Sequence, residues 1–483
     1  MMCAMIKPNA PSSRRKSGSS VARLRDQDSH ARYRVRWIPT FVGMTIFCLF
    51  ACAAIPAHAT TIQTVTSRSG VKAWLVEDHK LPLVAMHFAF RGGVEQDPAS
   101  KQGLATLSMD MLTEGAGDYD SSAFQQQLAD HSIALNFTAG RDALSGSMKS
   151  LSTDREEAFR LLGLALTAPR LDAKEFERLR GEQLSALRTQ LGSPDWQARY
   201  ALFQKIFGKH PYGQRRLGST KSLSGLTPDD VKNFIAAHLA RDNLVVAVAG
   251  DMTAAQVAQM LDQTFGALPR HARLTPVSDI VWPQDTASIL TAREGTQTKL
   301  LFAMPGPKQS DPDWYAAEIA NYILGGGGFS SRLMQDVRDK KGLTYGISTN
   351  LSPTEHGGLI VAEAATDNPK TAEAWETIQS TMHRFYDDGA TEKEINAAKD
   401  YLTGSLPLAL TSTDKIAAVM VGLQLDHRKA DYLDKRNDLI RAVTMDDIQN
   451  AIRRWFNPDR LTLSMVGKPD GMVSTETRAQ VRE

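Results

Sequence analysis

A glycine run and an arginine–tyrosine pair are the residues of this chain whose types and spacing could form a binding site. Four glycines, Gly325–Gly328, precede Phe329 and Ser330, and Arg338 and Tyr345 follow seven positions apart. Glycine lets the backbone take conformations closed to other residues and approach another chain closely. Arg338 offers a planar fork of donors, and Tyr345 offers a phenol. A glycine turn, a solvated arginine and a packed tyrosine would give the same pattern, because glycine runs mark turns more often than sites.

The residues around the pair predict where it lies. A helix is expected to carry Arg338, and a turn at Gly342 leads into a strand-like run that holds Tyr345. Both side chains would then lie together at the end of an element. No Lys-Ser or Lys-Thr follows the glycines at the spacing of a phosphate-binding loop, which argues against a nucleotide site.

The string GGGGFSSRLMQDVRDKKGLTYGI resembles the C-terminal half of the M16 metallopeptidases, the pitrilysin, insulinase and mitochondrial processing peptidase-like family. In that family a glycine-rich loop is followed by an arginine and a tyrosine, seven positions apart, that grip the substrate backbone. Arg338 and Tyr345 have this separation, and the resemblance covers nearly all of residues 60–470. It implies the following substrate-binding residues: Gly325, Gly326, Gly327, Gly328, Phe329, Ser330, Arg338 and Tyr345.

The metal motif of the family is replaced in the first half of this chain. Catalytic members carry His-x-x-Glu-His directly after Gly-x-Ala, on a helix that here spans residues 102–115. Two histidines one turn apart bind zinc, and the glutamate acts as general base on the metal-bound water. Thr106 stands for the first histidine, Met109 for the glutamate and Asp110 for the second histidine. The resemblance therefore implies no metal in this chain.

A third family ligand, a glutamate, would fall near Ala186 on the helix expected at residues 172–190, and Glu182 lies one turn away. The histidines after residue 59 contain no pair spaced i, i+4. His210, in His-Pro-Tyr-Gly, is interpreted as part of a structural loop, and His87 as a packing residue on a strand. Independent zinc peptidase activity is not expected from these residues.

The chain after its leader is a doubled unit. Asp230 and Asp447 head equivalent helices, and Gly250 and Gly467 close equivalent strands; each pair is 217 residues apart. Each copy begins with strands, continues with helices and closes with a strand, a pattern that favours an α+β layer with helices on one sheet face. In the first copy, the expected strands are 71–76, 83–90, 133–137, 144–148 and 245–249. The resemblance implies two homologous αβ halves, antiparallel sheets covered by helices, that face each other as a clamshell.

The predicted domains follow from this repeat. They are a leader at 1–59, a first M16-like domain at 60–268, a proline-punctuated linker at 269–286, a second M16-like domain at 287–474 and a tail at 475–483. The net charge of +2 argues against a nucleic-acid protein, and 42% apolar residues suffice for proper cores.

The leader has the pattern of an export signal. Basic residues precede the apolar run Phe41–Ile55, which is too short to cross a bilayer, and Ala57-His58-Ala59 forms a small-x-small cleavage site. The three cysteines, Cys3, Cys48 and Cys52, all lie in this leader. These features predict a periplasmic protein without disulfides, membrane span or lipid anchor.

The resemblance implies an M16B-type, non-catalytic subunit of a heterodimeric zinc peptidase. Its partner would be a His-x-x-Glu-His homologue whose zinc-bound hydroxide attacks a peptide, while Arg338 and Tyr345 bind that peptide from the opposite wall. One alternative is a stand-alone periplasmic peptide-binding or chaperone-like protein, which the retained pair fits equally well. Two others are a structural subunit of a larger assembly and an unrelated α+β enzyme. No Gly-x-Ser-x-Gly elbow supports the last of these.

Overall fold

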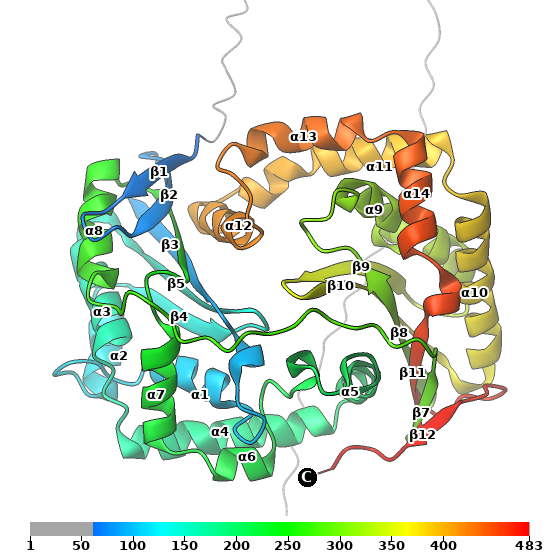
Figure 1. Cartoon of the computed structure of the whole chain (residues 1–483), viewed down its shortest axis with the longest axis horizontal. Coiled ribbons are helices and arrows are strands. Elements are labelled where there is room, and N and C mark those ends of the chain that lie inside the picture. The colour runs from blue at the N-terminus through cyan, green and yellow to red at the C-terminus, as the bar shows by residue number, and fades with distance from the viewer. Residues whose placement is uncertain (1–60, 483) are drawn as a thin grey trace, which may run out of the picture. The chain divides into compact units, whose positions relative to one another are not determined.

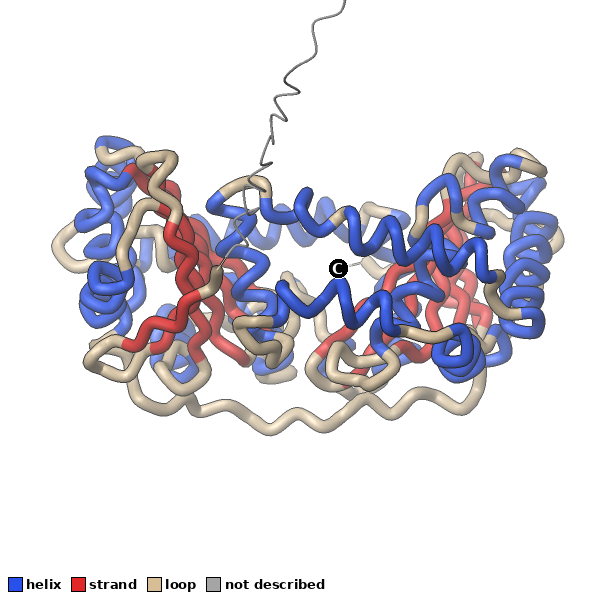
Figure 2. Tube along the Cα trace, turned by 90° about the horizontal axis from the view of Figure 1, so that it is seen from above, coloured by secondary structure: helices blue, strands red, loops and turns tan. Residues whose placement is uncertain are grey.

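The computed structural model describes residues 61–482, which lie in one compact unit and form two six-stranded sheets with helices packed against them (Figure 1, Figure 2). The predicted leader, with its export signal and its cysteines, lies outside the described residues. Within residues 61–482, no helix combines the length and the apolar character needed to span a membrane.

The first sheet has the strand order β1-β2-β6-β3-β5-β4. Its strands are β1 (Gln63–Thr66), β2 (Lys72–Glu77), β3 (Leu83–Arg91), β4 (Ala134–Ala139), β5 (Ala143–Leu151) and β6 (Leu244–Gly250). The helices of this half are α1 (Leu104–Met111), α2 (Ser121–Asp130), α3 (Arg155–Thr167), α4 (Ala173–Leu191), α5 (Pro194–Phe207), α6 (Thr220–Ser224), α7 (Pro228–His238) and α8 (Ala254–Phe265). The even-numbered residues of β3 enter the main core, because successive side chains of a strand point to opposite faces.

The second sheet has the order β12-β7-β11-β8-β10-β9. Its strands are β7 (Ser288–Ala292), β8 (Gln297–Gly306), β9 (Ile347–Thr354), β10 (Gly357–Asp367), β11 (Thr462–Gly467) and β12 (Glu476–Arg478). The α-helices of this half are α9 (Trp314–Asn321), α10 (Thr371–Asp388), α11 (Glu392–Gly404), α12 (Thr413–Leu425), α13 (Tyr432–Ala442) and α14 (Met445–Trp455).

The order of the strands confirms the duplication. Strands β2, β6, β3, β5 and β4 of the first sheet occupy the same places as β7, β11, β8, β10 and β9 of the second. Both sheets are mixed rather than purely antiparallel, since β2 pairs with β6, and β7 with β11 and β12, in parallel. Strand β12 comes from residues predicted to be a tail.

The two halves exchange one helix each, so helices cover both faces of each sheet and not one face as the sequence suggested. Helix α12 packs on β3 and β6 of the first sheet, where Ile416 and Met420 join a cluster that contains Ala85 and Ala247 (Figure 1). Helix α5 packs on β8 and β11 of the second sheet through residues that include Leu202. Periodicity identifies which helix residues are buried but not which sheet buries them.

Candidate functional site

Arg338 lies on a helical segment, as the sequence predicted, but the segment is a π-helix, η6 (Met334–Asp339). Single π-helical turns often occur at functional sites. Met334 and Val337 point into the core of the second half, which leaves Arg338 half-exposed on the opposite side. The backbone N–H of Leu343 donates to the carbonyl of Val337 at 3.0 Å, which ties the following turn to this helix.

An ion pair anchors the start of this helical segment to helix α11. Arg332 donates from Nε to Oε1 of Glu394 and from Nη2 to Oε2, both at 2.7 Å, and Nη2 also donates to the carbonyl of Gly389 at 2.9 Å. Partial burial opposes ionisation of Glu394, but the hydrogen bonds from Arg332 and Thr391 prevail and lower the pKa of this carboxyl to about 2. The paired carboxylate therefore holds the segment that carries Arg338.

The guanidinium of Arg338 is oriented by two neighbours. Its Nη1 donates to Oδ1 of Asp339 at 2.8 Å, and its central carbon lies 4.8 Å from the centroid of the Phe329 ring. A cation at this distance from an aromatic face is attracted by the ring quadrupole. The ring of Phe329 is itself 67% exposed, so it presents an apolar surface beside the guanidinium.

Tyr345 lies in the turn before β9 and not in a strand, so the strand-like run predicted to hold it begins only at Ile347. Its side chain is 89% exposed. The preceding Thr344 fixes this turn, because its Oγ1 lies 2.8 Å from the carbonyl oxygens of both Gly346 and Ala365, to either of which its hydroxyl can donate, and accepts from the N–H of Gly346 at 3.1 Å. A rigid turn thus presents a phenol that makes little contact with its own chain.

Arg338 and Tyr345 line one pocket of about 410 Å³, together with Gln297, Asp367 and Lys370. The backbone of Gly342–Leu343 forms part of the same wall. The pocket offers donors from the guanidinium, the phenol and the ammonium, and acceptors from the carboxylate and the amide. This set matches the alternating N–H and C=O groups of an extended peptide.

The four glycines have separate structural roles. Gly325 ends up buried against β9, where an added Cβ would lie 2.6 Å from Oγ1 of Thr349. Gly328 has φ +58 and open space beside it, and Gly326 is exposed. The run is the end of a π-helix, η4 (Tyr322–Gly326), followed by a short 3-10 turn. Gly325 therefore serves packing, and the exposed backbone begins at Gly326.

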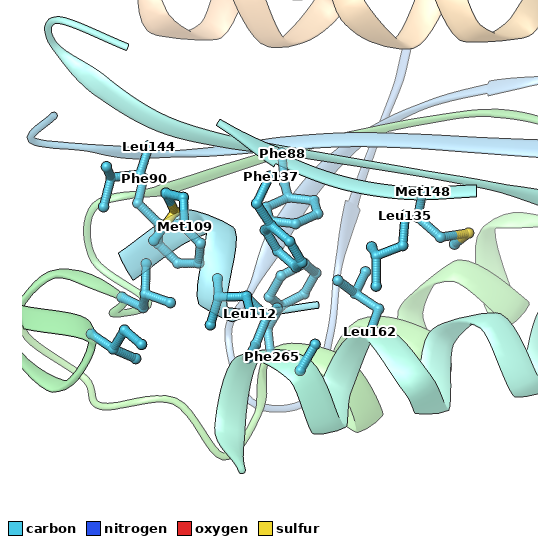
Figure 3. Packing of buried hydrophobic residues seen from close by; sticks show 14 of the residues in the cluster. Phe88, Phe90, Met109, Leu112, Leu135, Phe137, Leu144, Met148, Leu162 and Phe265 are labelled. Atoms are coloured by element: carbon cyan, nitrogen blue, oxygen red, sulfur yellow. The ribbon is translucent and has the colours of Figure 1, made fainter. Parts of the chain in front are cut away.

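The residues at the zinc-motif positions serve folding. Thr106 Oγ1 donates to the carbonyl of Arg216 at 2.9 Å. Met109 is buried in the main core, and its side chain points into the same cluster as Phe90 and Leu144 (Figure 3). A zinc ligand or a general base cannot be supplied by a buried thioether in this apolar cluster.

Asp110 is exposed at the surface of α1. Neighbouring residues nevertheless surround part of its carboxyl group, and this partial loss of hydration raises the pKa of Asp110 to about 6; the charge of Arg216 opposes the rise, and the carboxylates Glu182 and Glu114 add to it. Within residues 61–482, no group of three or more His, Cys, Asp and Glu side chains is arranged to hold a metal ion. The residues present therefore do not fit the family's zinc ion.

Helix α4 is joined to α1 by a residue that sequence reasoning missed. The Nε2 group of Gln183 donates to the carbonyls of Gly103 and Leu217, at 3.1 and 3.2 Å. Glu182, the preceding residue, accepts from Arg178 at 2.8 Å, and Ala186 is exposed. Hydrogen bonds through Gln183 join the two helices that zinc ligands would join in a catalytic relative. The sequence contained a sign of this role, because Phe176, Leu179, Gln183 and Leu187 recur at helical spacing on one face of α4 and Gln183 is the polar one among these four.

The two histidines considered from the sequence have structural partners. His210 accepts from the N–H of Tyr212 through Nδ1 at 3.1 Å, and its Nε2 lies 2.8 Å from the carbonyl of Ser278. His87 lies 3.0 Å from Oδ1 of Asp414, which belongs to the exchanged helix α12. Both interpretations as structural residues agree with these contacts.

The chain is similar in sequence to known proteins. Residues 225–402 match the family model described as the peptidase M16 inactive domain. The chain is 27% identical over 359 residues to a protein of Helicobacter pylori named non-peptidase homolog YmxG, covering 73% of this chain and 82% of the relative.

Two solved structures share the fold. The peptidase M16 inactive domain from Pseudomonas fluorescens superposes with a TM-score of 0.79 and 28% identity, covering 86% of this chain and 99% of that one. The periplasmic protease PqqL from Escherichia coli has a TM-score of 0.73 and 15% identity, covering 85% of this chain and 46% of that one. The comparisons and the replaced motif positions lead to one conclusion: the chain is similar to the peptidase M16 proteins, including their inactive domain, and it lacks the zinc-binding motif.

Proposed function

We propose that this protein is the non-catalytic, substrate-binding subunit of a heterodimeric M16 zinc peptidase in the periplasm. The observation that carries the proposal is that Arg338 and Tyr345 line one open pocket. At the positions of the zinc motif, by contrast, Thr106 and Met109 make contacts that stabilise the fold. A chain with a substrate-gripping half and no metal half requires a second chain to supply the metal.

The proposed work of the pocket is to hold an extended peptide. Arg338 and Tyr345, which line the pocket, donate hydrogen bonds to peptide carbonyls. The exposed Gly326 and Gly328 lie outside the pocket lining and let the peptide approach the backbone closely. Phe329 and Ser330 flank this path at the surface. Donors fixed before the substrate arrives can contribute about 3–4 kcal/mol to transition-state stabilisation when water is excluded. The partner is an M16 homologue with an intact His-x-x-Glu-His motif, and zinc is bound there.

Substitution of the two donors tests the proposal. In the reconstituted pair, Arg338→Ala and Tyr345→Phe are expected to lower kcat/KM on an unstructured peptide by about 10²-fold or more, because a preorganised donor contributes this much. The matched control is Arg453→Ala, which removes an exposed arginine of α14 outside the pocket. An unchanged kcat/KM for both pocket variants would contradict the proposal. Peptide binding without any peptidase activity in the mixture would instead support the stand-alone peptide-binding alternative.

A further inference from the structure

A second pocket lies on the first half, away from Arg338, between the end of α3, helix α7 and the segment after α8. Its volume is about 490 Å³, within the range of small-molecule sites. Most of its lining is apolar, and its floor contains three side chains that are almost completely buried: Leu166, Leu239 and Leu268. The proposed peptidase role uses none of these residues.

One wall of this pocket is an extended segment held firmly in place. The N–H of Gly117 donates to the carbonyl of Ala168 at 2.9 Å, and the N–H of Arg170 donates to the carbonyl of Gly115 at 3.1 Å. Leu171, at the end of the segment, has φ +55, which is costly for a bulky residue. Strained backbone of this kind persists only where its surroundings fix it.

The rim of the pocket carries charged side chains of both signs, and one of its cations, Lys232, is not paired within residues 61–482. Arg170 donates to Oδ2 of its neighbour Asp172 at 2.7 Å, so that charge is paired. Asp229 lies in the first turn of α7, where the helix dipole favours a negative charge. Among the described residues Lys232 has no hydrogen-bond or ion-pair partner, although it lines the pocket one turn further along α7.

We propose that this pocket binds a small amphiphile with an unbranched apolar chain and a carboxylate head, of the medium-chain fatty-acid type. The apolar chain of the ligand would leave water and lie against the apolar lining of the pocket. The carboxylate would pair with Lys232, since a charge-assisted hydrogen bond is stronger than a neutral one. A cationic head in the same position would meet the like charge of Lys232.

The test is calorimetric titration of the full-length protein with decanoate below its micellar concentration. Decyltrimethylammonium, with the same chain and the opposite charge, is titrated in parallel. One saturable site for decanoate is expected, with affinity at least tenfold higher than for the cation. Lys232→Gln should weaken decanoate binding about tenfold, whereas the control Lys221→Gln, which removes a surface lysine of α6 outside the pocket, should leave it unchanged.

Two variants fill the pocket from different walls. Ala236→Trp on α7 and Ala267→Trp after α8 should each abolish decanoate binding while far-UV circular dichroism remains that of the parent. The second variant provides the same test if the first does not fold. The proposal is overturned if decanoate shows no saturable binding, or if decanoate and decyltrimethylammonium bind with equal affinity. It is also overturned if a folded tryptophan variant binds decanoate as tightly as the parent does.

Discussion

Residues at and near the zinc-motif positions make contacts that join helices α1 and α4 in the absence of metal ligands. Thr106 bonds the carbonyl of Arg216, Met109 fills a core position, and Gln183 bonds the backbone of α1 and of the loop before α6. These contacts stabilise the helix pair without a metal ion. The sequence alone predicted that the zinc motif is missing. It could not predict the partners of Gln183, because these lie far from it along the chain.

The position of the family's general base gives the first prediction. Met109→Glu should lower the free energy of unfolding by about 3 kcal/mol or more, because it places a carboxylate without a partner among Phe90 and Leu144. Met109→Leu, which keeps volume and apolar character, should cost less than about 1.5 kcal/mol. Urea unfolding followed by circular dichroism measures both. If the glutamate variant were as stable as the parent, Met109 would not be a core residue.

The ion pair between Arg332 and Glu394 gives a pH-dependent prediction. The pKa of Glu394 is lowered to about 2 in the folded protein, so the pair stabilises the fold above the ordinary glutamate value near 4.5. This stabilisation is lost as the pH falls from about 4.5 toward 2. Glu394→Gln should cost about 1–2 kcal/mol at pH 7, since both side chains are partly exposed.

The measurement is urea unfolding of parent and Glu394→Gln at pH 7 and pH 3. The difference between the two proteins should shrink at the lower pH, because Glu394 of the unfolded parent, with an ordinary pKa near 4.5, then takes up a proton that the folded parent does not bind. A difference that stays constant would show that the charge of Glu394 contributes nothing. Glu392→Gln, on the same helix turn and without such a partner in the described part of the chain, is the matched control.

Among the elements, the π-helical segments position the proposed binding site. The sequence predicted a helix for Arg338, and η6 confirms it, but the wider turn was not visible from periodicity. Tyr345 was expected in a strand and lies in a turn, because the bonds of Thr344 to Gly346 and Ala365 delay the start of β9. Predicted strands such as 83–90 agree with β3 to within one residue, since their alternation is strong.

The close approach of η4 to β9 can be tested with two glycines. Gly325→Ala should lower the free energy of unfolding by about 1–3 kcal/mol, because the added methyl would lie 2.6 Å from Oγ1 of Thr349. Gly346→Ala has nothing within 4 Å of the added carbon and should change stability by less than about 0.5 kcal/mol. Equal effects in chemical denaturation would mean that η4 does not pack on β9 as described.

The described part of the molecule is a duplicated unit whose halves are joined by exchanged helices. Repeat spacing in the sequence was enough to predict the duplication, and the matching strand orders confirm it. The exchange of α5 and α12 was not predictable, since an apolar helix face does not specify its partner sheet. Arg91 strengthens this arrangement, donating to the carbonyls of Gln424 and Leu425 at 2.7 and 2.9 Å.

The exchange predicts that neither half folds alone. A chain divided within residues 269–286 should give two fragments that co-purify when co-expressed, because each supplies the helix that covers the other's sheet. Expressed separately, each fragment should lack a cooperative thermal transition, since one sheet face would be exposed. Tagged pull-down and calorimetry measure the two outcomes. A fragment that melts cooperatively as a monomer would contradict this account.

The most direct measurement is peptidase activity on a quenched peptide library, with this protein alone and mixed with an M16 homologue of the same organism that carries His-x-x-Glu-His. The account predicts no activity and no stoichiometric zinc for this protein alone, and activity in the mixture well above that of the homologue alone. Zinc-dependent hydrolysis by the purified protein alone would contradict it. A mixture no more active than the homologue by itself would contradict the proposed division of roles.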